Sequence, residues 1–177
     1  HTHRGSPPYE STPCEISMDL QPLIEKFALS LSEFRNNRRV TVAADRVYAL
    51  LATLKTSHGF DMLIDITAVD YLEYEGAADR FGVVYSLLNV ENGERLIVKT
   101  FVNDPNPSLP TVTTLWLGAD WMEREVWDMF GITFIGHADL RRILMPDEFS
   151  AHPLRKDYPL KGRGERHNFP VITRSES

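Results

Sequence analysis

The sequence contains a single cysteine, Cys14, among its 177 residues. One thiol cannot form a disulfide within the chain, and it cannot supply the four protein ligands that an iron–sulfur cluster usually takes. We therefore expect this chain alone to carry no such cluster. Long apolar runs are also missing, because the longest, Phe81 to Leu88, is far shorter than the ~20 residues of a membrane-spanning helix. No bilayer-spanning segment is predicted.

Basic residues are fewer than acidic ones. Lys and Arg number 19 against 25 Asp and Glu, a formal net charge of −6, which disfavours general binding to nucleic acid. Hydrophobic residues make up 42% and aromatic residues 10%, a composition typical of a folded globular protein. The start of the chain has neither an initiator methionine nor a basic-then-apolar signal. We expect the sequence to begin downstream of a start codon or a processing site.

Motifs for catalysis and metal binding are mostly lacking. The glycines at 131 and 136 have the spacing of a phosphate loop, but the lysine and hydroxyl residue that contact phosphate and magnesium are missing. Gly162 and Gly164 follow no predicted strand, so a dinucleotide site is not expected there. The histidines are scattered and no HExxH or CxxC spacing occurs, which argues against zinc. No Gly-x-Ser-x-Gly elbow supports a catalytic serine, although triad members converge only in a fold.

The first half of the chain divides into a tail and the start of a core domain. Residues 1–17 are rich in proline and poor in large apolar groups, so we predict a disordered or extended N-terminal tail. The core domain is assigned to residues 18–144. Helical periodicity begins after Asp19, the expected N-cap, and the helix is predicted to end by Asn36-Asn37. A short strand, Arg39 to Ala43, and a second helix that ends at Gly59 follow.

Three strands and a helix complete the core domain. The strands are predicted at 60–71, 81–90 and 95–102, and Asn92-Gly93 supplies the positive φ angles of a tight hairpin between the last two. Asp120 and Glu123 have the spacing of a capping box for a helix that Gly131 terminates. The element order indicates an α+β fold, with a mixed or antiparallel sheet covered by helices on one face.

Residues 145–177 are predicted to form an extended C-terminal tail. They contain four prolines and little periodicity, and at ~3.1 Å per residue they would reach far beyond the radius of a compact domain. Such a tail either wraps its own domain or docks on a partner. The run from His152 to Leu160 mixes apolar, aromatic and arginine residues, a composition enriched at interfaces, and favours docking on a partner.

Two stretches concentrate charge and aromatic rings, 121–130 and 139–144. An exposed Arg124 and Asp128 pair on one helix would contribute only ~0.3–0.5 kcal/mol, so stability alone hardly explains such a cluster. Arginine holds carboxylates bidentately and tolerates partial desolvation better than lysine. Both stretches are therefore predicted to make fixed contacts in a partly buried setting, within the fold or with another subunit. If Arg141 and Arg142 are buried in an assembly, replacing either with alanine would cost ~3–5 kcal/mol.

The same residues carry a family signature. It runs Glu123-Arg124-Glu125, Asp128, Met129-Phe130, His137, Arg141 and Ile143-Leu144, without a gap. In this pattern the chain resembles the thirty-kilodalton subunit of respiratory complex I, the proton-pumping NADH:quinone oxidoreductase. The resemblance extends over about Leu20 to Lys161, and it includes the segments 65–70, 98–100 and 152–160. Ala151, where many relatives have glycine, and the stretch 163–167 depart from the family pattern.

The resemblance implies a subunit without a cofactor. In that family FMN and the iron–sulfur clusters lie in neighbouring subunits of the hydrophilic arm, which pass electrons from NADH to quinone. It also implies contact with a large quinone-site subunit, here expected as a separate polypeptide, and with the iron–sulfur subunits. The location implied is peripheral to the energy-converting membrane, on the cytoplasmic face in a bacterium or the matrix face in a mitochondrion.

The polar residues of these motifs are candidates for contacts that lock the fold or meet a partner, and no catalytic, cofactor-binding or metal-binding role is assigned to any residue. These candidates are Glu123, Arg124, Glu125, Asp128, His137, Arg141, Arg142, Arg155, Lys156 and Asp157.

Two alternatives stay open. The chain could be the homologous subunit of a membrane-bound hydrogenase or of a ferredoxin-fed photosynthetic complex, whose arms reuse this domain. From a different class, it could be a stand-alone enzyme that uses His137 or His152 as a general base with a neighbouring carboxylate.

Overall fold

The fold was obtained as a computed structural model, which describes residues 18–35 and 37–164. In chain order the elements are α1 (Gln21–Phe27), β1 (Ser30–Phe34), β2 (Asn37–Thr41), α2 (Val47–His58), β3 (Met62–Asp70), β4 (Phe81–Leu88), β5 (Arg95–Val102), β6 (Ser108–Pro110), α3 (Ala119–Phe130) and β7 (Thr133–Ile135). The predicted tail 1–17 and the end of the C-terminal tail, 165–177, lie outside the described residues.

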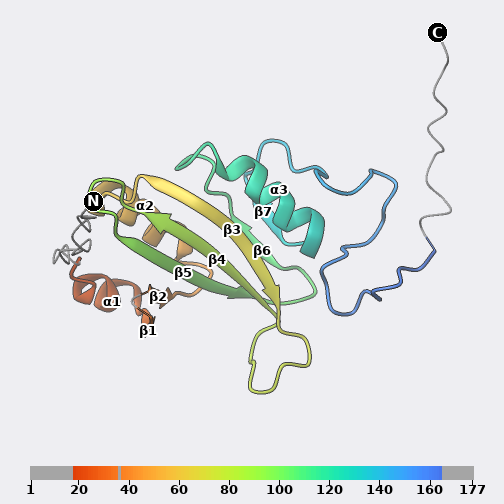
Figure 1. The fold of residues 1–177 in the computed structure, drawn as a ribbon, viewed down its shortest axis with the longest axis horizontal. Helices are drawn as coiled ribbons and strands as arrows, with labels where there is room; N and C mark the ends of the chain where they lie inside the picture. The colour runs from red at the N-terminus through yellow and green to blue at the C-terminus, as the bar shows by residue number, and fades with distance from the viewer. Residues whose placement is uncertain (1–17, 36, 165–177) are drawn as a thin grey trace, which may run out of the picture.

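The main sheet has five strands in the order β1-β2-β5-β4-β3 (Figure 1). Strand β2 runs parallel to β5, and the other neighbours are antiparallel. The sheet is therefore mixed, and together with the helices it confirms the predicted α+β class. A second sheet of two short parallel strands, β6 and β7, flanks α3.

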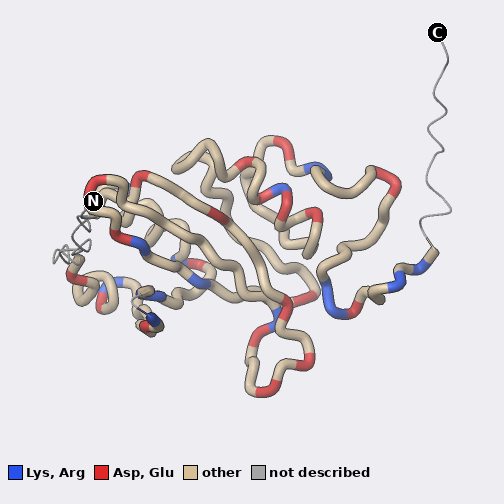
Figure 2. Tube along the Cα trace, viewed as in Figure 1, with Lys and Arg blue, Asp and Glu red and all other residues tan. Residues whose placement is uncertain are grey.

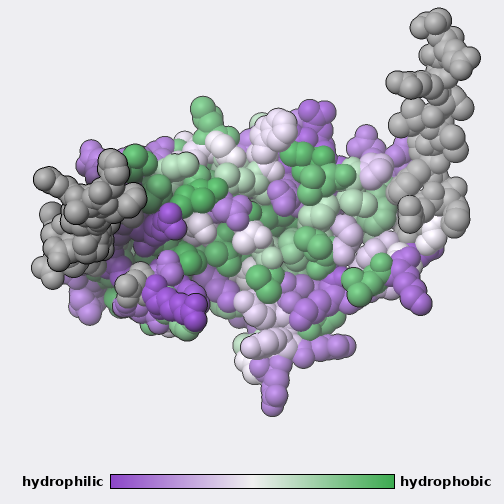
Figure 3. All heavy atoms as spheres, viewed as in Figure 1, coloured by the Kyte–Doolittle hydropathy of each residue, from purple (hydrophilic) through white to green (hydrophobic). Residues whose placement is uncertain are grey.

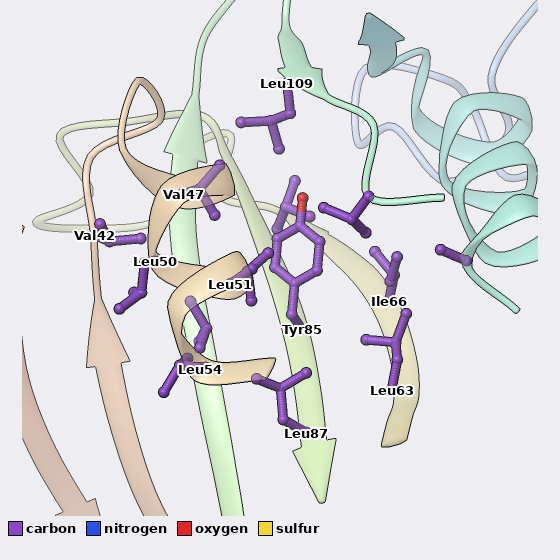
Figure 4. Close-up of a cluster of buried hydrophobic side chains, with 14 of the residues drawn as sticks. Val42, Val47, Leu50, Leu51, Leu54, Leu63, Ile66, Tyr85, Leu87 and Leu109 are labelled. Atoms are coloured by element: carbon purple, nitrogen blue, oxygen red, sulfur yellow. The ribbon is translucent and has the colours of Figure 1, made fainter. Parts of the chain in front are cut away.

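One face of the main sheet is buried beneath α2. Leu50, Leu51 and Leu54 of the helix pack toward Tyr85 and Leu87 of β4 (Figure 4), and all five are at most 1% exposed. Burial in β4 and β5 alternates along each strand, so the opposite face of the sheet is left uncovered. Helices thus cover a single sheet face, as the sequence predicts.

The N-terminal part of the core differs from the prediction. Helix α1 ends at Phe27 rather than near Asn36, because Ala28 adopts a left-handed conformation with φ of 52° and the chain then turns into β1. Strand β1 is exposed along its whole length, so it has no alternating apolar pattern by which a sequence would reveal it. Leu20 occupies the N-cap position of α1, and Asp19, one residue earlier, accepts the N–H of Gln21 at 3.0 Å.

Two further predictions, one for a turn and one for the start of a helix, also need correction. In the turn between β4 and β5 only Gly93 has a positive φ, 73°, because Asn89 organises a longer turn in which its carbonyl accepts the Gly93 N–H at 2.9 Å. The capping box is wrong: Gly118 is the N-cap of α3, and Glu123 points into the interior instead of back to the helix start. The helix ends at Gly59 and Gly131 are confirmed, with φ of 70° and 76°.

Candidate functional site

Helix α3 carries a fully buried carboxylate, Glu123. Its side chain accepts a hydrogen bond from the Thr111 hydroxyl at 2.6 Å and one from the Val112 N–H at 2.7 Å. Burial raises the pKa of Glu123, and the two hydrogen bonds only partly oppose that effect. The residue therefore ties the segment after β6 to α3.

His137, just after β7, closes the same cluster. Its Nε2 lies 3.2 Å from the Asp120 side chain and 4.0 Å from that of Glu123, and the imidazole is 0% exposed. The N–H of Asp139 donates to Nδ1 at 3.1 Å, so Nδ1 carries no proton and the neutral ring is protonated at Nε2. A ring with both nitrogens engaged and no exposure gives no support to His137 as the general base of a stand-alone enzyme.

Asp128 is the centre of a second cluster on α3. One carboxylate oxygen pairs with Arg142 at 2.5 Å, and the other accepts the N–H groups of Ile143, Leu144 and Met145 at 2.9–3.1 Å. Burial by itself would raise the pKa of Asp128, but the three N–H donors and the guanidinium outweigh it and lower that pKa. The ion pair fixes the loop 142–145 onto the helix.

Arg124 reaches the same loop in a different way. Its guanidinium donates to the carbonyls of Arg141 and Arg142 at 3.3 and 3.2 Å and lies over the ring of Trp121 at 5.6 Å. No carboxylate of the described chain forms an ion pair with it. Arg124 is nevertheless buried, so two carbonyls and an aromatic face replace a counter-ion.

The segment after this loop folds back across the end of α3. The His152 ring bonds the Asp128 carbonyl at 3.0 Å, and the Leu154 N–H donates to the Met129 carbonyl at 3.1 Å. Gly131 makes room for this ring, because a Cβ there would lie 2.7 Å from it. His152 thus has a structural position at the helix end, and its geometry gives no support to the general-base role considered for it.

Arg155, Lys156 and Asp157 contact residues at the end of the main sheet where β3 and β5 finish and β4 begins. Arg155 holds both oxygens of Asp104 at 2.7 and 2.8 Å, and the Lys156 N–H donates to Asp70 at 2.8 Å. Arg80 bridges Asp70 at 3.1 Å and Asp157 at 2.8 Å. Residues 152–157 therefore contact the chain's own core. Their docking on a partner, and the domain boundary after residue 144, stay predictions.

Four of the ten candidates are exposed: Glu125, Arg141, Lys156 and Asp157. Arg141 is 69% exposed and pairs with the exposed Asp139, and Glu125 is exposed on α3. Large apolar side chains of the same part of the chain are exposed as well: Leu117 is 90%, Trp121 66% and Leu144 60% exposed. The candidates thus separate into residues whose polar contacts hold α3, its loop and the sheet end together, and Glu125 and Arg141, whose side chains are exposed.

Sequence reasoning missed three polar residues on which these contacts depend: Asp70, Arg80 and Asp104. Asp70 ends β3 and Arg80 precedes β4. Opposite charges at the two ends of a strand connection can pair, and this spacing was visible in the sequence. Asp104 offered no such signal, because its partners Arg80 and Arg155 lie 24 and 51 residues away.

The described residues contain no group of three or more metal-ligating side chains placed to hold a metal ion. In the same part of the chain no helix is long and apolar enough to cross a membrane.

The fold and these contacts define a class of α+β domain in which most signature residues fix one helix and its loop, while a few are exposed beside apolar side chains. The family model of the respiratory-chain NADH dehydrogenase 30 kDa subunit matches residues 40–164, and the chain belongs to this family. The resemblance seen in the Glu-Arg-Glu signature is confirmed.

Relatives and solved structures agree with this assignment. The chain is 48% identical over 143 residues to an NADH-quinone oxidoreductase subunit of Geobacter sulfurreducens, covering 79% of this chain and 87% of the relative. It is 50% identical over 108 residues to NADH-quinone oxidoreductase subunit 5 of Thermus thermophilus, covering 58% and 52%. A trypsin-resistant fragment of Nqo5 superposes with a TM-score of 0.63 at 37% identity, covering 70% of this chain and all of that fragment.

A second solved structure belongs to a different complex. A chain of the membrane-bound sulfane sulfur reductase, an archaeal respiratory membrane complex, superposes with a TM-score of 0.71 at 27% identity, covering 89% of this chain and 93% of that chain. The domain is therefore shared beyond the NADH-quinone oxidoreductases.

Proposed function

We propose that this chain is a cofactor-free structural subunit in the hydrophilic arm of a proton-translocating NADH:quinone oxidoreductase. It contacts the large quinone-site subunit and the iron–sulfur subunits, which with FMN carry electrons from NADH to quinone. It associates with the membrane only through the complex, on the cytoplasmic face in a bacterium or the matrix face in a mitochondrion. The observation that carries this proposal is membership of the 30 kDa subunit family over residues 40–164.

The contacts of the signature residues support a structural role. Glu123, Asp128 and His137 are each held by two or more internal polar contacts, so they are committed to the fold. Arg141 and Glu125 are exposed, and so are Trp121 and Leu144 of the same helix and loop. A surface that combines arginine and tryptophan has residue types that are enriched at interfaces.

The test is purification of the tagged native chain from solubilised membranes, with FMN, iron and NADH-driven quinone reduction measured in the product. We expect flavin and iron to co-purify with the tagged chain and to be lacking in the same chain produced alone. Recovery of a free monomer from membranes, or FMN bound stoichiometrically by the isolated chain, would contradict the proposal.

A second candidate is the homologous subunit of a membrane-bound complex that does not oxidise NADH, such as a hydrogenase or a ferredoxin-fed photosynthetic complex. Similarity to a chain of the sulfane sulfur reductase complex favours keeping it. The same purification separates the two candidates, because only the first predicts a co-purifying flavoprotein that reduces quinone with NADH.

A further inference from the structure

The face of the main sheet opposite α2 has no covering element among the described residues. Figure 3 views the molecule from this side and shows apolar side chains exposed between polar ones over the strands. A hollow of about 370 Å³ lies on this face. Its apolar lining comes from Val84, Ile97 and Phe101, and Arg39, Tyr71 and Lys99 add polar groups.

Lys99 is held in a fixed position beside this hollow. Its Nζ donates to the Tyr71 hydroxyl at 2.6 Å and lies 4.6 Å from the ring centroids of both Tyr71 and Phe101. Gly82 on the neighbouring strand makes this arrangement possible, because a Cβ there would lie 2.9 Å from Lys99 Cε and from the Tyr71 ring. The ammonium group is therefore preorganised before any partner binds.

Arg39 supplies a second positive charge on the same face. The register pairs Arg39 with Ile97 and Thr41 with Lys99, so the two cations lie two residues apart along adjacent strands. In the described part of the chain neither cation forms an ion pair with a carboxylate. The protein as a whole has a net charge of −6, yet these two cations in one hollow have no carboxylate partner among the described residues.

We infer that this hollow binds an extended acidic segment of a partner subunit. One carboxylate of the segment lies between Arg39 and Lys99, and its apolar neighbours pack on Val84, Ile97 and Phe101. The inference rests on the proposed function, because it assumes that the chain works within an assembly. It adds a second contact surface, on the opposite side of the sheet from α2.

Charge complementarity favours an acidic peptide over two other occupants. The loop at 72–80 joins β3 to β4, projects beyond the sheet and carries Glu73, Glu75 and Asp79 (Figure 2). These negative charges would repel an anionic membrane. Glu75 and Asp79 border a second hollow that shares Lys99 and Phe101 with the first, whereas no described acidic residue lines the first hollow, so a single carboxylate between Arg39 and Lys99 stays clear of them. A second copy related by a two-fold axis would bring like charges together on its equivalent face.

The test uses the assembled complex with a photo-crosslinking residue, p-benzoylphenylalanine, at Ser32 or at Glu33. Ser32 lines the hollow, whereas Glu33 is the next residue of β1 and points to the other side of the strand, which makes it the matched control. We expect the Ser32 position to crosslink to an Asp- or Glu-containing segment of a partner subunit, identified by mass spectrometry. The Glu33 position should not yield that peptide.

Changes of charge then test the contact itself. Arg39→Glu and Lys99→Met should each lower the yield of the Ser32 crosslink at least about tenfold, the change expected for ~1.4 kcal/mol of lost interaction. Replacing the acidic residue of the crosslinked segment with Arg should restore the yield with Arg39→Glu. Arg95→Glu, exposed on the same strand as Lys99 but outside the hollow, should leave it unchanged.

Several results would overturn the inference. Crosslinks to lipid, to a second copy of this chain or to a segment without a carboxylate would each exclude the acidic segment. A chain that co-purifies with flavin and iron but gives no Ser32 crosslink would overturn the docking site alone. A chain that never co-purifies with them would overturn the proposed function and this inference together.

Discussion

Asp128 and Arg142 form a buried ion pair at 2.5 Å between the last turn of α3 and the loop that follows β7. The Asp128 side chain is 0% exposed and that of Arg142 is 11% exposed. Arg142 also donates to the Ala151 carbonyl at 3.1 Å, so it links three segments of the chain. The neighbouring Arg141 has no comparable contact, although the sequence presents the two arginines as equivalent.

The two arginines should therefore differ in the isolated protein. Arg142→Ala leaves the buried Asp128 without its counter-ion, and we expect the free energy of unfolding to fall by about 3–5 kcal/mol. Arg141→Ala removes an exposed side chain and should change it by less than about 0.5 kcal/mol. Urea unfolding of both variants measures the difference. Equal losses would show that the ion pair does not stabilise the fold.

The buried Glu123 predicts a pH dependence of stability with a defined sign. Its pKa in the folded protein is raised above the ordinary value of 4.5, so between 4.5 and that higher pKa the folded state binds more protons than the unfolded state. Stability contributed by this group therefore falls as the pH rises through that window. Glu123→Gln should remove the decline, as measured by urea unfolding from pH 4.5 to neutral.

The matched control for this experiment is Glu125→Gln, which changes an exposed carboxylate two residues along the same helix. That variant should keep the decline. If Glu123→Gln and the unmodified protein had the same pH profile, the carboxyl group would not titrate in the way that its burial implies.

Asp70 anchors the returning segment to the sheet. It accepts the N–H of Lys156 at 2.8 Å and that of Leu72 at 2.9 Å, and it pairs with Arg80. Asp70→Ala should raise the hydrogen exchange rate of the Lys156 amide at least about tenfold, because its acceptor is lost. Asp65→Ala, on an exposed position of the same strand, is the control. An unchanged rate at Lys156 would argue against this anchor.

Gly131 is needed for both its backbone conformation and the space it leaves. Gly131→Ala places a Cβ at φ of 76° and 2.7 Å from the His152 ring, so it should cost more than the ~1–2 kcal/mol of the backbone conformation alone. Gly93→Ala has a similar φ of 73° with nothing within 4 Å, and should cost only the backbone part. Unfolding free energies compare the two, and an equal loss would refute the role of His152 packing.

Features of the fold that depend on local chemistry were predictable. The end of α2 at Gly59 and of α3 at Gly131 follows from the left-handed conformation that glycine adopts without strain. The strands β3, β4 and β5 follow from β-branched residues and alternation. The exposed strand β1 and the short β6 and β7 lack such patterns, which is why the sequence did not reveal them.

The candidate site residues likewise divide into features that the local sequence indicates and features that depend on the tertiary structure. The sequence proposed candidates around α3 from the density of charge and aromatic rings, and in 155–157 from the mixed composition of 152–160 and the family resemblance, and their roles stay predictions. Which of them face inward was not identified. Glu123, expected to cap its own helix, instead bonds Thr111 and Val112, since a carboxylate on the buried side of α3 takes the nearest N–H and hydroxyl donors.

The sequence by itself determined the α+β class, the ends of two helices and the family signature, since each depends on residue type and short-range spacing. Tertiary structure alone decided that Arg142 is buried and Arg141 exposed, and that Arg155 meets Asp104 across 51 residues of chain. The physical reason is that pairing and burial depend on which surfaces meet when the chain folds. The residue types of two adjacent arginines do not show which of them will be buried.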